Sequence, residues 1–135
     1  MRTISLTADQ IRKLVGIARD ALPNESCALL LGNDDNIKKI LKARNSDESP
    51  VRFSIEPKEL IHAYSFAESI GMQVIAIFHS HPANPWPSST DVRFMEINPI
   101  IWVIYSTTCG ELKAFLYDDD QLLKEVRVRI IDPRE

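Results

Sequence analysis

The chain has 135 residues, a net charge of −3, 44% hydrophobic residues and 26% charged residues. This length and composition indicate one globular domain over residues 1–135, which can bury a core without disulfides. The negative net charge argues against a nucleic-acid partner, because such proteins carry basic patches. Two cysteines do not make a disulfide framework.

Membrane and export signals are also missing from the sequence. No apolar segment of the secretory kind follows Arg2. The longest apolar runs, residues 74–78 and 100–105, are far shorter than a bilayer-spanning helix. We therefore expect a cytoplasmic protein with no membrane partner.

The N-terminal half of the chain predicts two helices and three strands. Thr7 followed by Gln10 forms a capping-box pattern, with apolar residues at helical spacing behind it. Pro57 suits the first turn of a second helix, and Gly71 suits its end. Short runs that are fully apolar or alternate with polar residues predict strands. In chain order, we expect a helix over about residues 8–22, strands over 26–31, 37–43 and 51–55, and a helix over 57–70.

The C-terminal half predicts four strands and one short helix. Residues 74–78 are apolar, too few for a helix, and flanked by residues that break regular structure. Ser88 and Asp91 have the spacing of a helix cap. In chain order, we expect a strand over 74–78, a helix over about 88–98, a strand over 100–105, and a hairpin of strands 111–117 and 122–131. The expected fold class is α/β, a mixed and mostly antiparallel sheet packed by about three helices.

Two histidines and a carboxylate follow the apolar strand 74–78. His79 and His81 lie two residues apart, and in extended chain such residues point to the same side. Asp91 falls in the first turn of the next helix, where the helix dipole favours a carboxylate. Two imidazoles and one carboxylate leave the fourth position of a tetrahedral Zn²⁺ ion open, as in catalytic zinc sites. We therefore predict one zinc ion per chain, held by His79, His81 and Asp91.

An open zinc site needs a base beside it to take a proton from the metal-bound water. Glu25 stands just before the strand 26–31 and is the candidate, provided that this strand neighbours the one that ends at the histidines. The Ser88 hydroxyl is a candidate donor to an oxyanion on the attacked carbonyl. Each residue also has a plain structural interpretation: Glu25 as a solvated loop carboxylate, and Ser88 with Asp91 as a helix cap. The cap is compatible with metal binding.

Together, Glu25, His79-Ser80-His81-Pro82 and Ser88-Ser89-Thr90-Asp91 resemble the motif of the JAMM (MPN+) metalloproteases. That motif is a Glu followed far downstream by His-x-His-Pro and Ser-x-x-Asp. The order of strands and helices is similar as well, so the resemblance covers nearly the whole chain and implies a core like that of the cytidine deaminases. It implies that His79, His81 and Asp91 bind zinc, that Glu25 is the acid/base, and that Ser88 stabilises the tetrahedral intermediate.

The resemblance also implies a reaction. The family cleaves isopeptide or peptide bonds after the Gly-Gly tail of ubiquitin-like proteins. Six residues separate His81 from Ser88, a spacing similar to the bacterial and archaeal branch rather than to eukaryotic deubiquitinases. The implied function is a zinc isopeptidase, deubiquitinase-like or desampylase-like, whose partners are a ubiquitin-like modifier and its conjugates through lysine or another amine. Three points stay open: a peptidase that frees an amino acid from a sulfur-carrier protein, an idle scaffold of the same fold, and a homodimer.

Two other metal chemistries fit the pattern less well. Non-haem iron oxygenases also use two histidines and a carboxylate, but they usually sit on all-β barrels, and this chain predicts three helices. Zinc deaminases need a Pro-Cys-x-x-Cys ligand pair, which is absent from the sequence.

Four further residues receive structural interpretations or stay open. We expect His62 to be structural, Cys27 to be a small buried hydrophobe, and Cys109 to be a turn residue. Trp86 either contacts substrate or covers the edge of the core. The segment 51–55 is our candidate sheet edge for binding an extended tail by strand addition.

Overall fold

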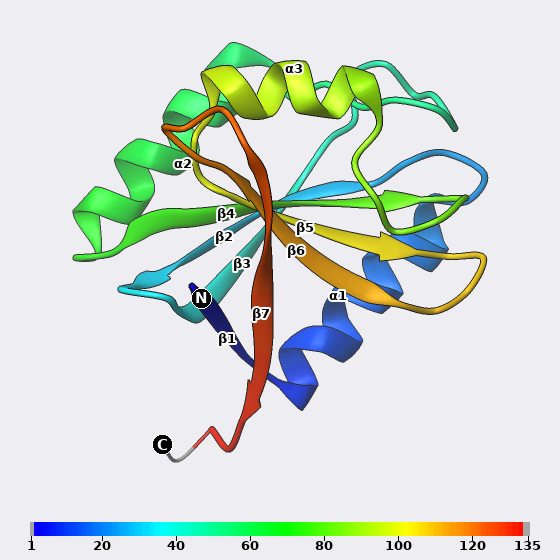
Figure 1. The fold of residues 1–135 in the computed structure, drawn as a ribbon. Coiled ribbons are helices and arrows are strands. Elements are labelled where there is room, and N and C mark those ends of the chain that lie inside the picture. Colours follow the sequence, from blue (N-terminus) through cyan, green and yellow to red (C-terminus); the bar gives the residue numbers. More distant parts are fainter. Residues whose placement is uncertain (1, 134–135) are drawn as a thin grey trace.

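The computed structural model describes residues 2–133, which form seven strands and three helices (Figure 1). No helix in this range is both long enough and apolar enough to cross a membrane. In chain order the elements are β1 (Thr3–Thr7), α1 (Ala8–Ala21), β2 (Cys27–Asn33), β3 (Asn36–Ala43), α2 (Pro57–Ser69), β4 (Gln73–His81), α3 (Ser89–Ile97), β5 (Ile101–Ser106), β6 (Leu112–Tyr117) and β7 (Leu123–Ile131).

The strands pair in the closed order β1-β3-β2-β4-β5-β6-β7. The pairs β2/β3, β2/β4, β5/β6 and β6/β7 are antiparallel, whereas β4/β5, β1/β7 and β1/β3 are parallel. This confirms the expected mixed, mostly antiparallel sheet. The ring closes through β1 and β3, which share the register pair Ser5 and Asn36. β4 pairs over most of its length with β2 on one side and with β5 on the other, so it is a central strand.

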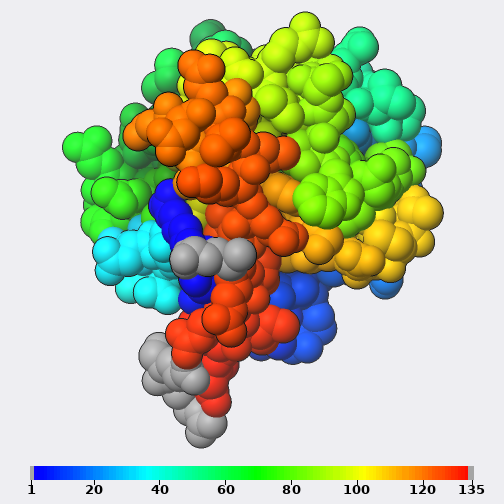
Figure 2. All heavy atoms as spheres, in the orientation of Figure 1, coloured from blue at the N-terminus to red at the C-terminus, as the bar shows by residue number. Residues whose placement is uncertain are grey.

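Helices cover both faces of this sheet, with α1 on one side and α2 and α3 on the other (Figure 1). Alternate residues of β2 contribute to the two cores: Ala28 and Leu30 pack with α1, and Leu29 and Leu31 pack with α2. Because both faces are buried, the central strands read as continuous apolar runs rather than alternating ones. In the space-filling view, β7 crosses the front of the molecule with the N-terminal strand β1 beside it (Figure 2).

The helix starts follow the caps that the sequence predicts. Thr7 Oγ1 accepts the Gln10 N–H at 3.1 Å, and the Thr7 N–H donates to Gln10 Oε1 at 2.9 Å. Pro57 occupies the first turn of α2, where its missing N–H costs no hydrogen bond. Gly71 follows the end of α2 with φ of +72°, a conformation that favours glycine. These local signals explain why the three predicted helices are confirmed within a few residues.

The predicted strand over residues 51–55 is wrong, because this segment belongs to no ladder. Its alternation is correct for Phe53, which is buried, and for Arg52, which is exposed, but not for Val51, which is 73% exposed. The backbone groups, however, bond to the preceding loop: Ser54 N–H donates to Asn45 Oδ1, and Ser54 O accepts from Ser46 N–H. The segment therefore does not form the strand edge that we expected.

The structure differs from the predicted strands in two further places. The strand predicted to end at Phe78 continues through His81, because β5 pairs with it as far as the pair His81 and Ser106. The two histidines therefore lie within β4 rather than after it. β1 was not predicted at all. Its long partner is β7, at the other end of the chain, so no local pattern announces the pairing.

Candidate metal centre

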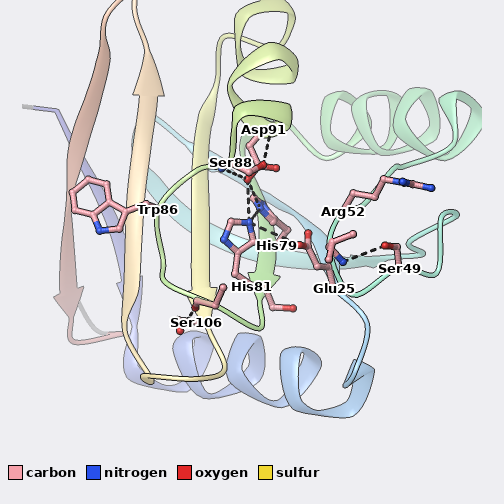
Figure 3. Close-up of polar contacts among 12 residues, drawn as sticks. Glu25, Ser49, Arg52, His79, His81, Trp86, Ser88, Asp91 and Ser106 are labelled. Carbon is pink, nitrogen blue, oxygen red and sulfur yellow. Dashed lines mark hydrogen bonds and ion pairs between the residues drawn. The ribbon is translucent and has the colours of Figure 1, made fainter.

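The pairing of β2 with β4 brings Glu25 next to the two histidines (Figure 3). Cys27 faces His79 in the register, and the Ser80 N–H donates to Ser26 O at 3.1 Å. Continuing this register places Glu25 beside His81. The strands 26–31 and 74–78 are thus neighbours, as the choice of Glu25 required.

Three side-chain atoms from β4 and α3 form a small triangle. His79 Nε2 lies 2.9 Å from His81 Nε2, and Asp91 Oδ2 lies 3.3 Å and 3.0 Å from these two nitrogens. Ligand atoms bound to tetrahedral zinc at about 2.0–2.1 Å are about 3.3 Å apart. The three residues are buried, with at most 6% exposure. Two sides of the triangle are somewhat shorter than this, so its donor types and approximate size are compatible with a metal ion.

Glu25 lies just outside this triangle. Its Oε2 is 3.9 Å from His81 Nε2, and Glu25, His79 and His81 also offer ligand atoms within 4.8 Å of one another. Within residues 2–133, Glu25 Oε1 is buried and has no hydrogen-bond partner. A buried carboxylate oxygen without a partner is costly unless it receives a proton or a hydrogen bond. One oxygen of Glu25 is therefore left for a further partner beside the cluster.

Neighbouring groups fix the orientation of the two imidazoles. Phe53 stacks on the His79 ring, with centroids 4.5 Å apart and planes at 25°, and the Trp102 ring meets His79 edge-on at 5.8 Å. His81 Nδ1 donates to Asn84 O at 3.1 Å, which turns His81 Nε2 to the cluster. Sequence reasoning missed all three supports. The buried alternation at Phe53 was the one available signal, and it does not say which residue Phe53 contacts.

Burial and mutual contacts shift the pKa values of the cluster. Burial raises the pKa of Glu25 to about 7, although His81 opposes the shift. Burial alone would raise the pKa of Asp91, but hydrogen bonds from His79 and His81 outweigh it and hold that pKa below its usual value. Burial lowers the pKa of His79. Asp91 is thus an anion and His79 is neutral. Burial alone would lower the pKa of His81, but its contacts with Asp91 and Glu25 outweigh burial and raise it, so a metal ion would compete with a proton there.

Ser88 caps α3 and also faces the cluster (Figure 3). Its Oγ accepts the Asp91 N–H at 3.1 Å, and its own N–H donates to Asp91 Oδ2 at 2.9 Å. The capping box therefore aims the carboxylate at the histidines. The cap uses the hydroxyl as an acceptor, so its hydrogen is still available to a further partner.

A cleft of about 290 Å³ opens onto Glu25, His81 and Ser88. Two loops form its walls, one before α2 and one between β4 and α3. The wall residues are Pro50, Val51, Pro82, Ala83, Asn84, Trp86 and Pro87. A carboxylate, an imidazole and a hydroxyl thus converge on one cleft.

The other residues singled out in the sequence lie outside the cluster. Cys27 is buried, as expected, and burial raises the pKa of its thiol to about 12, so it stays protonated. Cys109 is exposed and free. His62 is exposed on α2, 6.5 Å from the Phe66 ring. Trp86 is half exposed and its ring lies over the core edge, so both interpretations of it retain support.

Comparison with known proteins adds a family and several relatives. The family model of prokaryotic homologs of the JAB domain matches residues 7–117. A desampylase from Pyrococcus furiosus is 36% identical over 105 residues, which are 77% of this chain and 74% of that protein. A CysO-cysteine peptidase from Mycobacterium tuberculosis is 28% identical over 126 residues, 89% of this chain and 86% of that protein. A solved structure from Desulfitobacterium hafniense superposes with a TM-score of 0.83 and 33% identity, covering 96% of this chain and 93% of that one.

The buried Glu25 carboxylate should destabilise the metal-free protein at alkaline pH. Folding raises its pKa from 4.5 to about 7. The folded state therefore holds the proton more tightly than the unfolded state, and its free energy of unfolding is highest below pH 4.5 and falls as the pH rises through 7. Glu25→Gln removes the charge and keeps the shape. In thermal unfolding with chelator, we expect the variant to melt above the wild type at pH 8 by about 2–8 °C, a gap that shrinks toward pH 4.5. The exposed Glu96→Gln is the matched control, and equal melting of Glu25→Gln and wild type at pH 8 would contradict this.

Proposed function

The chain belongs to the family of prokaryotic homologs of the JAB domain, and we propose that it is a zinc-dependent isopeptidase acting on conjugates of a ubiquitin-like modifier. The observation that carries the proposal is the triangle of His79, His81 and Asp91, with the unpartnered Glu25 oxygen beside it. The relative named a desampylase supports the substrate class.

The donor set fits zinc better than other common ions. Two imidazole nitrogens and one carboxylate oxygen with an open position are a catalytic zinc set, whereas Mg²⁺ and Ca²⁺ prefer oxygen ligands. His79, His81 and Asp91 would hold the ion, one per chain. Zinc in this place would supply a Lewis acid that polarises the scissile carbonyl and lowers the pKa of water.

Glu25 performs the proton transfers in this proposal. Its buried Oε1 takes a proton from the attacking water, whose oxygen bonds to the carbonyl carbon of the terminal glycine. The same oxygen returns that proton to the departing amine as the C–N bond breaks. The target then leaves with a free amine and the modifier with a carboxylic acid, which releases the second proton of the water to solvent and becomes a carboxylate. Burial, which raises the pKa of Glu25 to about 7, suits a group that both accepts and donates a proton near neutral pH.

Ser88 supplies a hydrogen-bond donor to the same reaction. Charge develops on the carbonyl oxygen as water adds, and a placed donor stabilises that charge more than it stabilises the neutral substrate. The capping box fixes the Ser88 oxygen at the start of α3, on the lining of the cleft. The cap uses the Ser88 hydroxyl only as an acceptor, so its hydrogen is available to the oxyanion.

A second candidate is a peptidase that frees an amino acid from a sulfur-carrier protein. The relative named a CysO-cysteine peptidase favours it, and that relative shares a larger part of the chain. The bond chemistry is the same in both cases. The two functions differ in the leaving group, which is a lysine side chain of a protein or a free amino acid.

Metal content tests the ligand assignment. Protein purified without added metal should contain one zinc per chain by elemental analysis, and His79→Ala should lose it because one of three ligands is gone. His62→Ala, a histidine on the exposed face of α2, should keep the metal. Iron as the dominant metal, with oxygen-dependent turnover, would contradict the peptidase.

Turnover separates the roles of Glu25 and Ser88. Glu25→Gln should retain zinc and lose about a hundredfold or more in kcat, because the base is gone. Ser88→Ala should lose about 100- to 1000-fold, the size of one oxyanion donor. Ser88→Gly is the discriminating variant, since glycine caps a helix nearly as well as serine but has no hydroxyl. If Ser88→Gly turned over normally, the hydroxyl would have only a capping role.

Substrate variants test the modifier. A Gly-Gly tail has no side chains, so the cleft between the two loops must read its backbone and exclude bulk. Replacing the penultimate glycine of the modifier by leucine should block cleavage of a lysine conjugate, as followed by gel shift with and without chelator. A conjugate of an amino acid to the same tail distinguishes the second candidate. Equal cleavage of unrelated unfolded peptides would show a general peptidase instead.

A further inference from the structure

One asparagine side chain outside the proposed site uses its full hydrogen-bonding capacity. Asn45 Nδ2 donates to Glu25 O at 3.0 Å and to Arg52 O at 3.1 Å. Asn45 Oδ1 accepts from Asp47 N–H at 3.0 Å and from Ser54 N–H at 3.1 Å. An asparagine offers two donors and two acceptor sites, and all four are used here. The residue therefore ties both ends of the loop over residues 45–54 (the 45–54 loop) to each other and to Glu25.

The main chain of Glu25 depends on this loop. β2 begins at Cys27, so Glu25 lies outside the sheet ladder. Its N–H donates to Ser49 O at 2.8 Å (Figure 3), and its C=O accepts from Asn45. On the other side, the next residue is fixed to β4, because Ser26 N–H donates to Ser80 Oγ at 2.9 Å. The position of the Glu25 carboxylate thus follows from the 45–54 loop as well as from the sheet.

The same side chain also holds the ring that covers His79. Arg52 O and Ser54 N–H, which both bond to Asn45, flank Phe53 in the chain. Phe53 is 6% exposed and stacks on the His79 imidazole. The Asn45 side chain therefore holds both Glu25, the candidate base, and Phe53, which covers the candidate ligand His79.

We propose that Asn45 is a positioning residue that sets the place of the Glu25 carboxylate relative to His79 and His81. Its effect on turnover rests on the function proposed above, whereas its effect on the backbone does not. A proton-transfer group must lie within hydrogen-bond reach of water, and a displacement of about 1 Å costs about a hundredfold in rate. Asn45 supplies this precision from the loop, without touching substrate.

Two substitutions remove the hydrogen bond from Asn45 to Glu25 in different ways. Asn45→Asp keeps an oxygen for Asp47 N–H and Ser54 N–H but replaces the donor with an oxygen that faces two carbonyls. Asn45→Ala removes all four bonds and adds no charge, so agreement between the two variants rules out an effect of the added charge. Asn33→Asp is the matched control, because Asn33 Nδ2 donates to Gly71 O at 2.8 Å, away from the proposed site.

Amide hydrogen exchange tests the backbone part without any substrate. In both Asn45 variants, we expect exchange of the Glu25 amide to accelerate by about tenfold or more, because the 45–54 loop that carries its acceptor, Ser49 O, loses the bonds that hold it. The Leu30 amide, inside β2, should exchange as in the wild type, which shows that the fold is intact. Asn33→Asp should leave the Glu25 amide unchanged. An unaltered Glu25 amide in the Asn45 variants would overturn the proposal.

A double-mutant cycle tests whether Asn45 affects turnover through Glu25. Asn45→Asp and Asn45→Ala should lower kcat by about 10- to 100-fold with a smaller change in KM and zinc still bound. In the Glu25→Gln background, the same changes should lower kcat by less than about threefold, because Asn45 acts through the group already removed. Equal losses in both backgrounds would show a general structural effect and overturn the positioning role. If the wild type cleaves no conjugate, the proposed function fails, and hydrogen exchange alone decides whether Asn45 holds Glu25.

Discussion

The register between β2 and β4 is the constraint on which the candidate site depends. Cys27 opposite His79 and the bond from Ser80 N–H to Ser26 O together place Glu25 beside His81. A slip of one residue would turn the histidines to the other face of the sheet. Such a slip is strongly opposed, because both faces of these strands pack into apolar cores. The packing of the core therefore secures the geometry of a polar cluster at its edge.

That cluster is unfavourable to the fold on its own. Four ionisable side chains, those of Glu25, His79, His81 and Asp91, are all at most 6% exposed. Burying a carboxylate without full compensation costs free energy, and the raised pKa of Glu25 records that cost. Natural proteins keep such destabilising arrangements mainly where function requires them. A bound cation would offset part of the cost, since it attracts the carboxylates and uses the lone pairs of the imidazoles.

Local signals in the sequence were enough for the helices and for the triangle of His79, His81 and Asp91, whereas the place of Glu25 depends on the pairing of β2 with β4. The helix caps at Thr7 and Ser88 are each recognisable from four consecutive residues. Predicting that His79, His81 and Asp91 meet requires only one strand and the start of the next helix. The extended character of residues 51–55 was misread as a strand. Periodicity identified Phe53 as buried, but it wrongly placed Val51 on the same buried face, and it does not report what the backbone bonds to.

Contacts between distant segments could not be predicted in the same way. The strand β1 pairs along its length with β7, at the other end of the chain. The stacking of Phe53 on His79 joins residues 26 positions apart, with the helix α2 between them in the chain. Asn45 is similar, because an asparagine after a strand is common and its four partners are fixed by the fold. Supports of this kind are visible in three dimensions alone.

Two overlapping sets of residues can reach one ion, and a comparison of zinc affinity decides between them. His79 and His81 belong to both sets, while Asp91 and Glu25 compete for the third position. The direct measurement is the zinc dissociation constant of Asp91→Ala beside that of Glu25→Ala. Residues that only support a metal ligand typically change metal affinity by about 10- to 100-fold when they are mutated. We expect Asp91→Ala to weaken zinc binding by more than about 100-fold, as for a direct ligand, and Glu25→Ala to change it far less. The opposite order would contradict the account, because Glu25 would then be a ligand and not the base.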